Sequence, residues 1–489
     1  MTAPQKTNFA RATIHGAFWR YAAFYSGKLM VFVSTIILAR LLTKEEFGVV
    51  GYAVTVIGFL EGLSDLGIGP ALIYHRDDPR AADTAFWLGL LISSILFGLT
   101  FLFGPLVGVF FNDPRAIPVT QILALTFPIS ALSDIHESLL RKQLAFGRNF
   151  IPSFVQALTK GVASIVFALL GFGPWSLIYG QLSGTAIAVI AYWLIFPWRP
   201  SFRIARDLTR SLLNYGLKIV SVDMLAIALL NIDYLLVGRY MGAAALGVYT
   251  LGFRIPELFI LQFCNTISTV VFPVYSKMRD EPGALSRAFL TTMRYVALIT
   301  IPIGLGLALV ARPVVLTIFT RKWLEAADVI RTISIYALFL AVFAYNAGSV
   351  YKAQGRPEVL TKLALIRITI LAPAMWWAVA KIGTLVAVGW THIIVAFIGG
   401  MINLIVAARL LHISWRSVVA TIAPAALAGG LMAVAVRITL TLTTLAPTWA
   451  QLTICVIVGA ITYGAGLWWL QRDVMLNAGR TLRTALTRA

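Results

Sequence analysis

The sequence predicts an all-α polytopic membrane protein, and three observations support this prediction. Hydrophobic residues make up 59% of the 489 positions, whereas charged residues make up only 12%. A soluble domain is usually about 45–50% apolar and about 25% charged. The mean hydropathy of the chain is +0.85. Because a membrane-spanning helix needs roughly 20 mostly apolar residues, this apolar content is enough for about fourteen helices.

Charged, glycine-rich and proline-rich breaks divide the chain into fourteen predicted spans, whose ends are set only to within several residues. The first span is too long for the apolar region of a signal peptide, and no clear small-residue cleavage site follows it. In chain order the spans are 18–41, 47–72, 86–111, 117–139, 151–171, 175–197, 212–238, 246–275, 289–311, 326–350, 360–380, 383–408, 417–437 and 449–471.

The distribution of basic residues predicts the orientation. With the N-terminus inside, inward segments and the span ends next to them contain 24 lysines and arginines, whereas outward loops and the span ends next to them contain nine. Cytoplasmic loops of membrane proteins carry such an excess. Both termini are therefore predicted to be cytoplasmic, with the protein in the cell inner (cytoplasmic) membrane. This placement also accounts for the net charge of +20, so no nucleic-acid partner is expected.

The sequence lacks the residue patterns that ATP binding, nucleophilic catalysis, zinc binding and disulfide formation require. No predicted connection is long enough for a soluble domain, and no Gly-x-x-x-x-Gly-Lys-Ser/Thr loop is present to bind ATP phosphates. There is no nucleophile triad and no zinc-ligand spacing, so neither catalytic residues, nor a cofactor, nor a metal is predicted. Cys264 and Cys455 lie in apolar runs and indicate no disulfide framework. The segment HRDD at 75–78 could suggest a metal or sugar-nucleotide site, but a solvated loop is its ordinary interpretation.

One short segment occurs twice. An Arg, six residues, Leu or Phe, and then Gly-Val run from Arg40 to Gly48 and again from Arg239 to Gly247, 199 positions later. Each copy lies between the first and second spans of a six-span unit, so both copies enter the membrane from the same side. RKQLAFGRNF (141–150) and YKAQGRPEVL (351–360) similarly link the fourth and fifth spans of their units. We therefore predict an N-terminal lobe at 1–200, a second lobe at 201–410, and an appended helix pair with a cytoplasmic tail at 411–489.

The segments LARLLTKEEFGVVGYA and SDLGIGPALI resemble the opening of Wzx-type oligosaccharide flippases and polysaccharide exporters. These families belong to the multidrug/oligosaccharidyl-lipid/polysaccharide exporter superfamily. The resemblance continues through NIDYLLVGRYMGAAALGVY, FPVYSKMRD, RKWLEAADVIR and YKAQGRPEV. Lys44 stands where the family often has Pro. These motifs describe turns and packing, so they identify the family without identifying the cargo.

The resemblance implies two six-helix lobes around a V-shaped cavity. It also implies alternating-access movement of undecaprenyl-diphosphate-linked polysaccharide repeat units from the inner to the outer leaflet, with coupling to an ion. The implied partners are a lipid-linked oligosaccharide and membrane lipids, with a polysaccharide polymerase and glycosyltransferases as further expected partners. A transporter of this kind is not an enzyme.

Apart from four basic residues near span ends, fifteen charged residues fall inside the predicted spans. Because one isolated charge at mid-membrane costs about 2.5–3.5 kcal/mol, these residues must pair between helices or line a polar cavity, and both interpretations stay open. Helical spacing groups them into faces. One face carries Tyr21, Tyr25 and Lys28, another Glu61, Ser64 and Asp65, and a third Arg254, Glu257, Asn265 and Ser268.

The implied cargo assigns roles to these side chains, because a diphosphate favours cations while sugars favour hydroxyl-compatible and aromatic groups. The candidate substrate-binding residues are Lys28, Lys160, Lys218, Arg254, Arg367, Tyr21, Tyr25 and Asn265. The candidate ion-coupling residues are Glu61, Asp65, Asp233 and Glu257. One hypothesis gives the bases of one lobe to the diphosphate and the acids of the other to the ion; the alternative is a single charge network. Interfacial anchoring explains the two tyrosines equally well.

Two other functions remain as alternatives. A small-molecule or multidrug exporter of the same superfamily would share the fold, but deep basic residues argue against a cavity for cationic drugs. A membrane enzyme of polysaccharide assembly would need a large outward loop with acid–base residues. The longest predicted outward loop, about 312 to 326, is short and offers no such pair.

The even span count makes a testable prediction. A reporter fused after Ala489 should show a cytoplasmic C-terminus, because fourteen crossings return the chain to its starting side. Alkaline phosphatase and green fluorescent protein fusions measure this directly. A periplasmic phosphatase signal would contradict the span count.

Overall fold

A computed structural model of the chain describes residues 27–64, 80–143, 145–202, 204–279, 281 and 283–471. These residues form helices joined by short connections, and no strand occurs among them. Within these ranges twelve helices are long and apolar enough to cross a membrane. The predicted all-α polytopic class is therefore confirmed. The count of fourteen stays a prediction, because the first predicted span is described only from residue 27 and the stretch Met224–Met278 covers two predicted spans.

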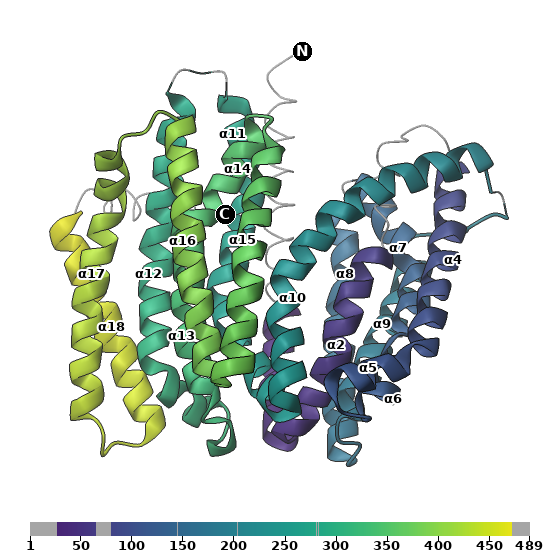
Figure 1. Cartoon of the computed structure of the whole chain (residues 1–489), viewed down its shortest axis with the longest axis horizontal. Helices are drawn as coiled ribbons and strands as arrows, with labels where there is room; N and C mark the ends of the chain where they lie inside the picture. The colour runs from purple at the N-terminus through teal and green to yellow at the C-terminus, as the bar shows by residue number, and fades with distance from the viewer. Residues whose placement is uncertain are drawn as a thin grey trace. The chain divides into compact units, whose positions relative to one another are not determined.

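Internal contacts divide the chain into two compact units, Met1–Gly247 and Val248–Ala489. In the first unit, a helix at 27–41 precedes the other described helices (Figure 1). These are α2 (Lys44–Ser64), α4 (Arg80–Leu102), α5 (Gly104–Phe111), α6 (Ala116–Leu123), α7 (Thr126–Lys142), α8 (Phe146–Leu169), α9 (Trp175–Ile195) and most of α10 (Arg206–Pro256). The predicted lobes, with a boundary at residue 200, stay a prediction.

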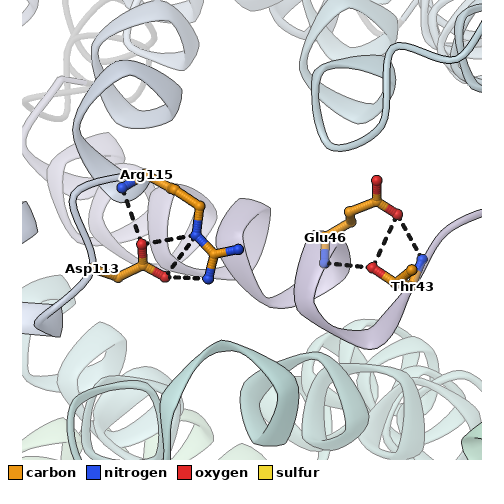
Figure 2. A network of polar contacts seen from close by, with 4 residues as sticks. All are labelled: Thr43, Glu46, Asp113 and Arg115. Carbon is orange, nitrogen blue, oxygen red and sulfur yellow. Dashed lines mark hydrogen bonds and ion pairs between the residues drawn. The ribbon is translucent and has the colours of Figure 1, made fainter.

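The first copy of the repeated segment begins α2 with a reciprocal cap. The Glu46 backbone N–H donates to Thr43 Oγ1 at 3.2 Å, while the Thr43 N–H donates to Glu46 Oε2 at 2.7 Å (Figure 2). A Ser/Thr-x-x-Glu pair of this kind satisfies two backbone donors that the first helical turn leaves unpaired. The sequence TKEE therefore ends one helix and starts the next within two residues.

A second polar turn joins α5 to α6. Arg115 donates from Nη2 to Asp113 Oδ2 at 2.8 Å and from Nε to Oδ1 at 2.9 Å (Figure 2). The hydrogen bond from the Arg115 side chain holds the pKa of Asp113 below its usual value. The pair therefore stabilises this turn above the ordinary carboxyl pKa of about 3.9, and its contribution is lost as the pH falls through the lowered value.

The third predicted span begins earlier than expected, at Arg80 rather than residue 86. Asp83 lies in its first turn, where the Ser201 N–H donates to Oδ1 at 3.0 Å. Trp87 Nε1 donates to the Ser201 carbonyl at 2.9 Å, and its ring stacks on Phe202 with centroids 4.2 Å apart. The segment after α9, for which the sequence predicts only a loop between spans, is thus held against the start of α4. These bonds are long-range and leave no local pattern in the sequence.

The second repeated turn is narrower than predicted. The sequence predicts spans at 212–238 and 246–275 on either side of a loop. In the structure the chain is helical from Arg206 to Pro256. It leaves helical geometry only at Gly242, where φ is 80° and ψ is −178°. Glycine adopts a positive φ without the steric penalty that a Cβ brings. One residue therefore makes the bend for which the sequence predicts several.

The two copies of the repeat contact each other within the first unit. A Cβ added at Gly48 would overlap the Ala243 carbonyl, and a Cβ added at Gly247 would overlap the Lys44 carbonyl. Residues 44 and 243 are also 199 positions apart, so the two contacts are equivalent under the repeat. Because glycine lacks a side chain, the helix backbones approach as closely as small-residue interfaces in membranes allow. The repeated glycines thus form one reciprocal crossing, here called the glycine crossing.

The second unit contains the remaining helices, several of them longer than the predicted spans. They are η1 (Glu257–Leu261), α11 (Gln262–Met278), α12 (Ala284–Ile318), η2 (Arg321–Trp323), α13 (Ala326–Leu340), η3 (Ala341–Tyr345), α14 (Asn346–Ala353), α15 (Pro357–Trp377), η4 (Ala378–Ile382), α16 (Leu385–Leu410), α17 (Trp415–Leu442) and α18 (Thr448–Leu470). The last pair packs on α12, where Tyr463 donates to the Leu298 carbonyl at 2.8 Å.

Aromatic residues in the family-like motifs are buried anchors. Tyr275, in FPVYSKMRD, donates to Asn346 Oδ1 at 2.8 Å, and Asn346 Nδ2 donates to the Phe289 carbonyl at 3.1 Å. Tyr351, in YKAQGRPEV, donates to the Asn403 carbonyl at 2.8 Å. Trp323, in RKWLEAADVIR, is fully buried. These motifs therefore determine packing in the second unit.

Because of the glycine crossing, adding a single methyl group at Gly247 should destabilise the folded protein strongly. Gly247→Ala should lower the melting temperature of the detergent-purified protein, because the helices must separate to admit the Cβ; such overpacking costs about 1–3 kcal/mol. Gly306→Ala, in α12, is the matched control, since a Cβ there meets nothing within 4 Å. Equal melting temperatures for the two variants would contradict the close approach.

Candidate functional site

In the first unit, helix 27–41 lies along α8. Gly27 lies opposite Ala157, where an added Cβ would be 3.8 Å from the alanine Cβ, and Gly161 lies opposite Ser34 at 3.1 Å by the same measure. Small residues on both helices permit this approach. Lys28 and Lys160 therefore lie on neighbouring helices, and both are half-buried.

The backbone position of Lys160 is determined by α9. A Cβ on Gly180 would lie 2.9 Å from the Lys160 carbonyl oxygen, and one on Gly184 would lie 2.9 Å from Lys160 Cβ. Gly180 and Gly184 form a Gly-x-x-x-Gly stripe, a pattern that brings membrane helices close together. Glu61, exposed near the end of α2, interacts electrostatically with Lys160. The structure therefore brings together a predicted base and a predicted acid in this unit.

The other candidates of the first unit have different environments. Asp233 is only 1% exposed on α10, so it is a core residue rather than part of an open surface. Lys218 also lies on α10, but its side chain is outside the described part of the chain. Tyr21, Tyr25 and Asp65 lie outside the described residues altogether, as does the HRDD segment. Their roles stay predictions.

In the second unit, Arg254 and Glu257 form an ion pair, with Nη1 and Oε2 3.1 Å apart. Gln262 donates from Nε2 to the other carboxylate oxygen at 3.5 Å. The pair lies where α10 passes into the π-helical turn η1, directly after Pro256. Proline has no N–H for the preceding turn, and single π-helical turns inside α-helices occur frequently at functional sites.

The π-helical turn corrects the predicted face of Arg254, Glu257, Asn265 and Ser268. That face assumed 100° per residue along the whole span, but residues 257–261 wind more slowly and shift the register of the residues after them. Arg254 and Glu257 stay together because they precede the shift. Asn265 instead interacts with Tyr345, at the end of η3.

Arg367 connects to the same region from α15. Its Nη2 donates to the Tyr336 hydroxyl at 3.1 Å, and its charge acts on Tyr345. Two groups of residues in the second unit, the Arg254–Glu257 pair and the set of Asn265, Tyr336, Tyr345 and Arg367, are here together called the C-terminal polar cluster.

Sequence reasoning missed the residues that support this cluster. Tyr249 hydrogen-bonds His392 Nε2 at 3.0 Å, and the His392 ring packs on Tyr336 with centroids 4.8 Å apart. All three side chains are buried. A lone histidine in the apolar run WTHIIVAFIGG is a usable signal, because ionisable residues inside membrane spans seldom lack a role. The single tyrosines carry no such signal, because an isolated Tyr in an apolar run is common.

The cluster combines groups suited to an anionic, hydroxyl-rich ligand. Two guanidinium groups can bind phosphate oxygens through charge-assisted hydrogen bonds, while the tyrosine hydroxyls and the Asn265 amide can both donate and accept. Glu257 neutralises Arg254 and offers acceptors for sugar hydroxyls. Among the described residues no group of three or more His, Cys, Asp or Glu side chains could hold a metal ion.

Comparison with known proteins gives a consistent result. Residues 37–328 match the family described as "Polysaccharide biosynthesis protein". The chain is 26% identical over 401 residues to the teichuronic acid biosynthesis protein TuaB of Bacillus subtilis (strain 168), covering 81% of this chain and 82% of that protein. It is 24% identical over 374 residues to the succinoglycan biosynthesis transport protein ExoT of Rhizobium meliloti (strain 1021), covering 73% and 76%.

Among solved structures, the fold is similar to the lipid II flippase MurJ in an inward closed conformation. The TM-score is 0.75 at 15% sequence identity, and the alignment covers 94% of this chain and 99% of that one. At this identity the likeness concerns the fold, which by itself does not specify a cargo.

The exposure of Asn265 allows a labelling test. Asn265 is exposed, whereas the adjacent Cys264 is 1% exposed and Cys455 is also buried. A membrane-impermeant maleimide should therefore label Asn265→Cys and leave the native protein unlabelled, because the reactive thiolate forms only in contact with water. Labelling is measured by mass shift in membrane vesicles. An unlabelled variant would show that Asn265 faces lipid.

Proposed function

Since this chain belongs to the polysaccharide biosynthesis protein family, we propose that it is a lipid-linked oligosaccharide flippase. It moves a polyprenyl-diphosphate-linked repeat unit, of the undecaprenyl type, from the inner to the outer leaflet by alternating access. The match covers more than half of the chain, and one relative is a succinoglycan transport protein. The fold likeness to a lipid II flippase is compatible with a cargo of this class.

The observation that carries the proposal is the C-terminal polar cluster. Arg254 and Arg367 are cations within apolar stretches of α10 and α15, and such charges are costly in a membrane unless they have partners. A diphosphate entering the membrane needs cationic partners, and its sugars need the hydroxyl and amide groups that Tyr345 and Asn265 provide. Binding therefore replaces part of the hydration that the cargo loses.

The presence of both an acid and a base in each unit argues against divided labour between the lobes. Glu61 interacts with Lys160 in the first unit, and Glu257 pairs with Arg254 in the second. In the absence of cargo, each acid lowers the free-energy cost of keeping its partner base charged inside the membrane. On cargo binding the acid is released and can take up a coupling ion. Glu61 and Glu257 are thus the favoured coupling residues, while the burial of Asp233 favours a structural role.

Location and partners follow from the same proposal. The multi-pass protein lies in the cytoplasmic membrane with both termini inside, where glycosyltransferases build the cargo and beyond which a polymerase extends it. It has no catalytic residues of its own, because flipping makes and breaks no covalent bond.

Transport by purified protein in liposomes tests the proposal. Wild-type protein should expose a fluorescent polyprenyl-diphosphate oligosaccharide to a membrane-impermeant glycosidase. Arg254→Gln should slow the rate of transport by about tenfold or more, because an uncharged amide replaces a charge-assisted contact worth about 1.5–3 kcal/mol.

Arg331→Gln is the matched control. Arg331 and Asp328 form an ion pair with the same spacing in sequence and the same 3.1 Å separation, but on an exposed part of α13. This variant should transport at the wild-type rate. Equal losses in both variants would assign Arg254 to stability alone. Wild-type liposomes that pump ethidium but do not flip the glycolipid would establish the multidrug exporter instead.

A further inference from the structure

Helix α8 carries four polar side chains on one side of a stretch that is long and apolar enough to cross a membrane. At about 100° per residue they fall within about 60° of one another. They are here called the α8 polar stripe and comprise Asn149, Ser153, Gln156 and Lys160. At about 1.5 Å per residue the stripe is about 16 Å long. Only Lys160 among its members is a candidate binding residue from the sequence.

The opposite side of α8 is the side that suits lipid. Four exposed apolar side chains share that face, again within about 60° of one another. They are Ile151, Val162, Val166 and Leu169. A lipid-facing surface would not group polar side chains as the stripe does. The stripe therefore faces protein or water rather than acyl chains.

Helix α9 covers only part of the stripe. A Cβ added at Gly184 would lie 2.8 Å from the Gln156 carbonyl oxygen and 2.9 Å from Lys160 Cβ, so the two helices pack closely here. Ser153 nevertheless stays exposed, and the other three members are half-buried. The stripe thus follows the edge of the α8–α9 interface, where its polar groups remain accessible.

The side chain of Gln156 indicates that the stripe binds a ligand. Its amide makes no hydrogen bond among the described residues, and neither of its polar atoms is fully buried. A primary amide inside a membrane span is costly unless water or a polar ligand lies beside it. The side chain therefore has both donors and its acceptor available.

Tyr192 of α9 orients the amide at the start of the stripe. Its hydroxyl donates to Asn149 Oδ1 at 2.9 Å, and the Tyr192 side chain is buried. Asn149 Nδ2 has no partner among the described residues, so its two donors are available as well. Ser153 Oγ donates to the Asn149 carbonyl at 3.2 Å and keeps its lone pairs as acceptors. Groups that are already oriented lose little side-chain entropy on binding.

The uncharged part of the stripe selects the class of ligand. Two amides and one hydroxyl can both donate and accept, which matches the hydroxyl groups of a neutral sugar. A phosphate would favour cations instead. The stripe ends at Lys160, the base that interacts with Glu61, so the sugar-binding groups lead to a candidate diphosphate contact.

We propose that Asn149, Ser153 and Gln156 bind neutral sugars of the cargo and determine which repeat units the protein accepts. This inference rests on the proposed flippase function. It adds a second surface for sugars, in the first unit, whose three members carry no charge.

Binding of two fluorescent lipids to the full-length protein in detergent tests the stripe. One is a polyprenyl diphosphate that carries a neutral disaccharide, and the other is the same lipid without sugars. Gln156→Leu removes the amide and should weaken binding of the glycolipid by about three- to tenfold, as the loss of one or two hydrogen bonds predicts. The sugar-free lipid should bind the variant and the wild type equally. Fluorescence anisotropy measures both affinities.

Thr159→Val is the matched control, because it removes a half-buried hydroxyl from the same helix but outside the stripe. It should bind both lipids like wild type. Gln156→Asn keeps an amide on a shorter side chain and should retain part of the affinity for the glycolipid. Gln156→Leu should melt no lower than wild type, because an apolar side chain replaces an amide that has no protein partner.

An equal loss of affinity for both lipids would overturn the proposal, because it would assign Gln156 to folding or to the lipid part of the cargo. If Gln156→Leu selectively weakens glycolipid binding but wild-type liposomes do not flip the glycolipid, the proposed transport function fails while the sugar site stands. If wild-type liposomes flip the glycolipid and Gln156→Leu binds it unchanged, the sugar site fails alone.

Discussion

The packing of the two repeated segments depends on the glycine crossing in the first unit. There the helix backbones approach closely at two contacts, Gly48 with Ala243 and Gly247 with Lys44. Two helices can cross at this distance only where one of them lacks a Cβ at each contact, as Gly48 does opposite Ala243 and Gly247 opposite Lys44. The reciprocal geometry means that each copy of the repeat is part of the other copy's packing surface. A membrane interior offers no hydrophobic driving force between helices, so shape complementarity of this kind supplies much of the association. The Thr43–Glu46 cap starts α2 just before Gly48, and the bend at Gly242 lies just before Gly247, so both features set the direction of a helix close to the crossing.

Charge placement follows a second constraint, the cost of an unpaired ion in a medium of low dielectric constant. Most described charged groups that lie deep in a helix have a local counter-charge or hydroxyl partner. The partner is close in sequence for Arg254 and on another helix for Lys160 and Arg367. A pair with one carboxylate and one base can exist without cargo and can open when an anion competes for the base. Stability and binding therefore use the same side chains, which is a physical reason for placing charges at this depth at all.

Irregular helix geometry gives some side chains directions that a straight α-helix could not give them. The π-helical turns η1 and η3 begin or end at Glu257 and Tyr345, both members of the C-terminal polar cluster. A wider turn changes the direction of every later side chain, so a residue such as Asn265 can reach Tyr345 from a helix whose earlier turns face elsewhere.

The sequence by itself determined the class of the protein, because apolar runs of membrane length and a charged fraction of 12% admit few other folds. It also contains the repeated segment, the spacing of Thr43 and Glu46, and the common face of Arg254 and Glu257, since all of these depend on neighbours within four residues or on a fixed period. Only the tertiary structure decided that the repeated glycines contact each other. It alone brought Lys160 into electrostatic interaction with Glu61, buried Asp233, and joined Arg367 to Tyr336. Those outcomes depend on which helices become neighbours, and on a register that one π-helical turn alters without changing the apolar pattern from which the helices were predicted.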